Sequence, residues 1–98
     1  MNEERLKGLM GLCVRAGQSI FGEDSCLKAI RSRQAALLIL DGGISEKSAE
    51  KLERACDREA IPRIRLAEGL LEQATGRSGM AMAVRKGSFA EQMVRCLD

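Results

Sequence analysis

The chain of 98 residues contains no histidine, no tryptophan and no tyrosine, and phenylalanine occurs only at Phe21 and Phe89. The missing histidine removes the commonest general base and a common metal ligand. With so few aromatic side chains there is no platform on which the bases of a single-stranded nucleic acid could stack. The composition therefore argues against an enzyme and against a single-strand binder of the stacking type.

Closely spaced cysteine pairs and long apolar runs are also missing. The four cysteines, Cys13, Cys26, Cys56 and Cys96, lie far apart, and none forms a Cys-x-x-Cys pair. In a chain without histidine, this spacing predicts small buried side chains in a reducing compartment and no metal site. No apolar run approaches the ~18–20 residues that cross a bilayer, and the N-terminus is acidic where a signal peptide is basic. We expect a cytoplasmic protein with no cofactor, metal or membrane contact.

Size and composition are those of one globular domain. Hydrophobic residues make up 45% of the chain and charged residues 31%, which is enough apolar material for a single core over residues 1–98. The formal net charge is only +2, so any affinity for nucleic acid must come from a local patch. The span from Lys28 to Arg33, which holds three cations and no acid, is one candidate.

Apolar periodicity and turn residues predict alternating helices and strands. Helices are predicted over residues 3–15, 22–32, 45–60, 67–75 and from 88 onward, and strands over 18–21, 35–40, 62–66 and 80–84. The continuous apolar run Ala35–Leu40 is typical of a central strand buried on both faces. This order predicts an α/β fold, a single-domain three-layer α-β-α sandwich with a four-stranded, mostly parallel (mixed) sheet. Ser88 and Glu91 predict a capping box on the last helix.

The stretch Gly22–Arg31 carries the strongest indication of function. Glycine opens it, Asp24 or Ser25 can cap a helix, and Lys28 and Arg31 lie one turn apart on the same helical face. The positive end of the helix dipole and its free backbone N–H groups suit a phosphate. Taken alone, the stretch is either an RNA-binding helix end or an ordinary capped helix with a solvated face.

Set in this order of elements, the chain resembles the kink-turn RNA-binding ribosomal-protein superfamily, and more closely its bacterial YlxQ-like branch. The resemblance covers nearly the whole chain and rests on Leu12–Gln18, Gly22–Ile30, Ala35–Leu40, Ile61–Pro62, Leu71–Gly76 and Gly87–Ala90. It implies a non-catalytic protein that binds a sharply bent RNA duplex, kink-turn or ribosomal RNA, through the second helix's N-terminus and a nearby apolar loop. It also implies ribosomal or translation-associated proteins as further candidate partners.

The family's helix motif, Gly-x-Asn-Glu-x-x-Lys, corresponds here to Gly22–Lys28. The glycine and the lysine match: the first lets RNA approach the backbone closely, and the second can meet a phosphate or a guanine acceptor. Arginines after the motif can add phosphate contacts. The resemblance therefore implies an RNA-binding set made of Gly22, Glu23, Asp24, Ser25, Lys28, Arg31, Arg33, Leu66 and Ala67.

Three positions leave a second function open. Asp24 replaces the family's asparagine, Ser25 replaces its glutamate, and Glu68 lies in a loop that the family keeps more apolar or neutral. These residues predict, as an alternative, a protein-interaction module that kept the fold but lost kink-turn recognition. Arg65 and Arg77 are either solvated or extend the RNA-binding side.

Overall fold

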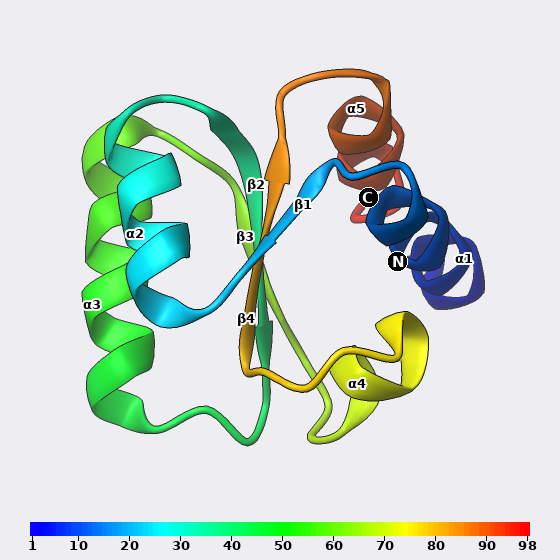
Figure 1. The fold of residues 1–98 in the computed structure, drawn as a ribbon, viewed down its shortest axis with the longest axis horizontal. Coiled ribbons are helices and arrows are strands. Elements are labelled where there is room, and N and C mark those ends of the chain that lie inside the picture. The colour runs from blue at the N-terminus through cyan, green and yellow to red at the C-terminus, as the bar shows by residue number, and fades with distance from the viewer.

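Five helices and four strands alternate along the computed structural model, which describes residues 1–98. The helices are α1 (Glu3–Arg15), α2 (Glu23–Arg31), α3 (Glu46–Glu59), α4 (Leu70–Thr75) and α5 (Ser88–Arg95). The strands are β1 (Ser19–Phe21), β2 (Ala35–Asp41), β3 (Arg63–Leu66) and β4 (Ala81–Arg85). Helices α2 and α3 cover one face of the sheet, and α1, α4 and α5 cover the other (Figure 1). The predicted three-layer α/β sandwich is confirmed.

The four strands form one mixed sheet in the order β1-β4-β2-β3. Strands β2 and β3 pair in parallel, whereas β4 pairs antiparallel with both β1 and β2. It follows that β1, β2 and β3 point the same way and β4 alone is reversed. The alternation of elements predicts the common direction of the three strands. It does not predict that β4 inserts between β1 and β2, and because of this insertion the sheet is mixed, with two of its three strand pairings antiparallel, although the sequence predicts a mostly parallel one.

Each face of the sheet has its own apolar core because successive side chains of a strand point to opposite faces. The core beneath α1, α4 and α5 receives Leu37, Ile39, Met82 and Val84 from the two central strands. The core beneath α2 and α3 receives Leu38, Leu40, Ala81 and Ala83. Strand β2 is thus buried on both faces, as its apolar run predicts, and the small side chains of β4 leave room for α2 and α3.

Helix α1 has a side-chain cap, whereas the side-chain caps predicted for α2 and α5 do not form. The side chain of Asn2 caps α1 by accepting the backbone N–H of Arg5 at 3.1 Å. Helix α2 begins at Glu23 with Gly22 as its cap residue, so the side chains of Asp24 and Ser25 lie inside the first turn and cap nothing.

The predicted capping box on the last helix does not form. Helix α5 begins at Ser88 itself, after Gly87, and no side chain caps it. The hydroxyl of Ser88 instead accepts a hydrogen bond from the side-chain amide of Gln92 at 3.0 Å. The helix begins one residue earlier than the sequence signal indicates, because Gly87, with a φ of +143°, takes the cap position. None of the five helices combines the length and the hydropathy of a membrane-spanning segment.

Candidate nucleic-acid interface

The N-terminal end of α2 follows β1, and the loop after β3 lies at the same end of the sheet because β1 and β3 run in the same direction (Figure 1). Gly22 adopts a φ of +99°, a conformation that glycine tolerates best. No side chain accepts a hydrogen bond from the first turn of α2. Its backbone N–H groups are therefore left for an external acceptor such as a phosphate oxygen.

The outer face of α2 carries the predicted polar residues. Asp24, Ser25, Lys28 and Arg31 are exposed, while the opposite face packs into the core beneath α2 and α3. Neither Lys28 nor Arg31 takes part in any of the chain's ion pairs. Both cations are therefore free to meet an external anion.

Glu23 is engaged by the neighbouring helix α3. One oxygen of its carboxylate lies 3.4 Å from the Nζ atom of Lys51. The side chain of Ser48, and after it Lys51 and Lys47, lower the pKa of Glu23 from its ordinary value, and partial burial opposes them. The first turn of α2 is thus tied to α3 by an ionised carboxylate.

The other three predicted residues, Arg33, Leu66 and Ala67, differ in position and exposure. Arg33 lies beyond the C-terminal end of α2, a helix of about 14 Å that separates it from Gly22, and its guanidinium pairs with Glu59 at 3.2 Å. Leu66 is 4% exposed, because its side chain belongs to the core beneath α1, α4 and α5. Of the two predicted loop residues, only Ala67 presents an exposed side chain.

The two arginines whose role the sequence leaves open have different surroundings. Arg65 is held between β3 and α3, where its guanidinium lies 3.4 Å from Glu46 and 3.7 Å from Glu53. The guanidinium of Arg77 lies 4.6 Å from the ring centroid of Phe21, the residue directly before Gly22. Stacking on this ring holds a cation beside the start of α2.

Asp41, at the end of β2, organises this end of the sheet and is the one charged side chain in the buried core. Its carboxylate accepts backbone N–H groups from Gly43 at 2.8 Å, from Gly69 at 3.0 and 3.1 Å, and from Leu71 at 3.2 Å. Burial alone raises the pKa of Asp41, but these hydrogen bonds outweigh it and hold the pKa below its ordinary value.

Helix α4 follows Gly69 and has no side-chain cap from a neighbouring residue. The distant Asp41 carboxylate therefore caps this helix. This contact also explains why α4 begins at Leu70 and not at Ala67, where the apolar pattern places its start. Sequence reasoning missed the role of Asp41, although an aspartate that closes an apolar strand before two glycines is a signal that could have drawn attention to it.

The turn after β2 packs directly on the loop after β3. A Cβ atom added to Gly42 would lie 2.7 Å from the carbonyl oxygen of Leu66 and 2.8 Å from the backbone nitrogen of Glu68. Only glycine permits this approach. The loop that carries Ala67 is therefore fixed from two sides, by the Asp41 carboxylate and by this close backbone contact.

The loop end of the sheet also carries negative charge. A hollow of about 200 Å³ there is lined by Asp41, Glu68 and Glu72, together with Gly69 and the segment 78–80. No lysine or arginine lines it. The cations near this end are Arg77 and those on the outer face of α2, so positive and negative side chains occupy separate parts of this end of the sheet.

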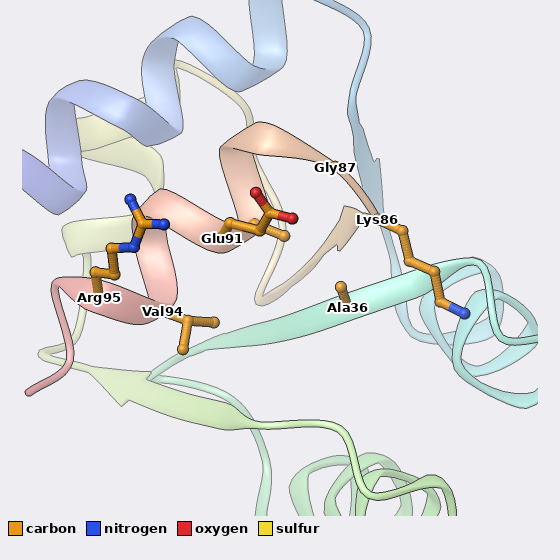
Figure 2. A pocket seen from close by; sticks show the side chains of 7 residues that line it. Ala36, Lys86, Gly87, Glu91, Val94 and Arg95 are labelled. Carbon is orange, nitrogen blue, oxygen red and sulfur yellow. The ribbon is translucent and has the colours of Figure 1, made fainter.

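The largest hollow of the molecule lies elsewhere, between α5 and the start of β2, and has a volume of about 620 Å³ (Figure 2). Its lining consists of Ala36, Lys86, Gly87, Ala90, Glu91, Val94 and Arg95. The charged side chains of Lys86, Glu91 and Arg95 extend from separate positions around small apolar side chains (Figure 2). No serine, threonine or cysteine lines this hollow.

The four cysteines are free and buried, which confirms their predicted role as small core side chains. Burial raises the pKa of Cys13 and of Cys56 to about 11 and that of Cys26 to about 12. Thiols with such pKa values are inert near neutral pH. No group of three or more cysteine and acidic side chains is arranged to hold a metal ion.

Known proteins with similar sequences share nearly the whole length of the chain. Over 92 residues it is 29% identical to the RNA-binding protein YlxQ of Bacillus subtilis (strain 168), with 92% of each chain covered. Over 98 residues it is 25% identical to the RNA-binding protein YlxQ of Enterococcus faecium, with 99% of this chain and 95% of the relative covered. No family model matches the chain.

Solved structures share the fold. A protein with unknown function from Bacillus halodurans C has a TM-score of 0.88 at 26% identity, with 95% of this chain and 96% of that chain covered. The Giardia lamblia 15.5kD RNA binding protein has a TM-score of 0.75 at 17% identity, with coverage of 95% and 81%.

Proposed function

We propose, from a similarity to the YlxQ proteins that extends over nearly the whole chain, that this protein is a non-catalytic RNA-binding protein. Residues 1–98 form one RNA-binding domain. We place it in the cytoplasm, where RNA is available and four unpaired cysteines stay reduced. The observation that carries the proposal is that the two YlxQ relatives are named RNA-binding proteins and match 92% and 99% of this chain.

The finer proposal concerns the kind of RNA and where it binds. We infer that a bent duplex, as in a kink-turn or in ribosomal RNA, meets the N-terminal end of α2 and the loop at Ala67. Three features support this site: the uncapped first turn after Gly22, the unpaired Lys28 one turn later, and the cation of Arg77 beside Phe21. A Cβ added at Gly22 would meet nothing within 4 Å, so RNA can approach this backbone.

Rigidity at this end supports recognition by shape. The Asp41 carboxylate fixes the loop after β3 before any ligand arrives, so little ordering of the chain opposes binding. Structured RNA is recognised mainly through its shape and backbone. Once bound to ribosomal RNA, the protein would lie beside ribosomal or translation-associated proteins, which are its further proposed partners.

One observation favours a second candidate function. The acidic hollow at Glu68 and Glu72, together with the exposed Asp24, would repel phosphate and could instead face a basic protein partner. A protein-interaction module with the kink-turn fold is the resulting alternative. It predicts protein partners that remain bound after nuclease treatment in a pull-down.

A gel-shift titration tests both candidates. A kink-turn RNA and a straight duplex of equal length are titrated with the protein side by side near physiological salt. We expect tighter binding of the kink-turn RNA. Equal affinity for the two RNAs would overturn recognition of the bend, and absence of binding to either would overturn RNA binding altogether and favour the protein-interaction module.

A further inference from the structure

A groove between α2 and α3 concentrates positive charge. It has a volume of about 550 Å³ and is lined by Arg31 from α2 and by Lys47, Glu50, Lys51 and Arg54 from α3. The three α3 cations recur at intervals of four and three residues and therefore share one face of the helix. The lining contains no apolar residue.

Most of these cations have no partner within the protein. Lys51 pairs with Glu23 at 3.4 Å, but Arg31, Lys47 and Arg54 occur in none of the ion pairs. Arg54 forms no ion pair with Glu50, although the spacing of four residues would allow one. Three unpaired cations on the two walls of one groove are therefore available to an external anion.

The charge of the groove exceeds that of the whole protein. Four cations and one carboxylate give the groove lining a formal charge of +3, while the whole chain has a net charge of +2. The remaining residues thus sum to −1. The positive charge of the protein is therefore concentrated in the groove, and the other residues are nearly neutral in sum. The electrostatic field of the groove lining attracts a polyanion.

The groove adjoins the proposed recognition end of α2. The contact between Glu23 and Lys51 joins the first turn of α2 to α3, and Arg31 lines the groove two turns further along α2. Lys28 lies between these two residues in sequence, on the exposed face of α2 that it shares with Arg31. A phosphate backbone that leaves the N-terminal end of α2 therefore meets Lys28 and then the cations of the groove.

We propose that the groove between α2 and α3 is a second RNA contact, which binds the phosphate backbone of a strand extending from the bent duplex. This inference rests on the proposed RNA-binding function and adds Lys47, Lys51 and Arg54 to its binding residues. The occupant is a phosphate backbone and not a protein segment, because peptide docking relies on buried apolar anchors and this groove has none.

Two unpaired groove cations are removed together to test this, in the variant K47Q/R54Q. The matched control R15Q/R95Q removes the same charge from exposed arginines on α1 and α5, which cover the other face of the sheet (Figure 1). Affinity for a kink-turn RNA with a single-stranded extension is measured by fluorescence anisotropy at several salt concentrations. Thermal melting checks that each variant is folded.

We expect K47Q/R54Q to weaken RNA binding roughly tenfold or more at 0.1 M salt. The slope of log K against log salt should become about 2 units less steep, because two phosphate contacts are lost. The control R15Q/R95Q should change the affinity and the slope much less. E50Q, which removes the only carboxylate of the groove, is expected to tighten binding severalfold. A tighter complex is a result that damage to the fold would not produce.

The outcomes separate this inference from the function on which it rests. If the wild-type protein binds RNA but K47Q/R54Q and the control lose the same affinity, the groove contact is overturned and RNA binding stands. An acidic peptide that competes for the groove while RNA binding is unaffected by K47Q/R54Q would also overturn it. If the wild-type protein binds no RNA, the proposed function fails first, and the groove contact with it.

Discussion

The carboxylate of Asp41 accepts the backbone N–H of Gly69, 28 residues further along the chain, with both of its oxygens, at 3.0 and 3.1 Å. The contact joins the end of the central strand β2 to the start of α4. Because the Asp41 carboxylate also binds the N–H groups of Gly43 and Leu71, a single buried side chain fixes the geometry of two loops.

Removal of this carboxylate is expected to destabilise the fold. D41A leaves the buried N–H group of Leu71 without an acceptor and also removes the acceptor of Gly43 and Gly69, so we expect the free energy of unfolding to fall by about 2–4 kcal/mol. Urea denaturation measures this loss of unfolding free energy. The control D24A alters an exposed aspartate with no ion pair and should cost less than about 1 kcal/mol. An equal effect of the two substitutions would contradict the anchoring role of Asp41.

The lowered pKa of Asp41 predicts a pH dependence of stability. A carboxyl whose pKa is lower in the folded than in the unfolded protein stabilises the fold fully above its unfolded pKa of about 4. The stabilisation is lost as the pH falls through the folded value. The difference in unfolding free energy between wild type and D41N should therefore shrink as the pH is lowered from about 5 to about 2.5. The contribution of Glu23 is the same in both proteins and cancels in this difference. A difference in unfolding free energy that stays constant with pH would refute the prediction.

Gly42 and Gly8 provide a matched pair of substitutions with opposite expected signs. G42A places a methyl group 2.7 Å from the carbonyl oxygen of Leu66 and should destabilise the protein by about 1–3 kcal/mol. Gly8 lies on the exposed side of α1, where an added Cβ meets nothing within 4 Å, so G8A should stabilise it by about 0.5–1 kcal/mol. Chemical denaturation of both variants is the measurement. Stabilisation by G42A would show that the two loops do not pack as described.

Lys28 is the matched family position on which the proposed RNA site depends most directly. K28A should weaken kink-turn binding by about 1–3 kcal/mol, because an unpaired cation one turn into α2 is lost. The control K86A removes another exposed lysine, which follows β4 at the opposite end of the sheet from Gly22. Gel-shift titration compares the two variants, and a weakening of the same size in K86A would argue against a specific site at α2.

The fold was largely predictable from sequence because its signals are local. The apolar spacing of Leu6, Leu9, Met10 and Cys13 predicts α1 with its observed bounds, and the run Ala35–Leu40 predicts a strand buried on both faces. The resemblance to YlxQ-like proteins, stated from motifs in the same order, is confirmed by sequence similarity over nearly the whole chain. These features depend on neighbours within a few residues of one another.

Features that depend on distant residues were not predictable in the same way. The insertion of β4 between β1 and β2 depends on pairing across more than forty residues. The cap that Asp41 provides for α4 also acts between residues far apart in sequence, since Gly69 lies 28 residues after Asp41. At the candidate site, the sequence places Lys28 and Arg31 on one face correctly, but it cannot show that Glu59 pairs with Arg33 or that Leu66 is buried. The basic groove was missed because the charges of α3 have the pattern of a solvated helix face.

The position of β4 also sets when this protein can act. Strand β1 pairs only with β4, and the backbone N–H of Gly22 donates to the carbonyl of Ala81 at 3.2 Å. During translation, β1, α2, β2 and β3 emerge from the ribosome before β4, the strand that joins β1 to the rest of the sheet. The hydrogen bond that holds Gly22 at the start of α2 therefore forms only after Ala81 has emerged, and a nascent chain that ends earlier lacks this part of the proposed recognition surface.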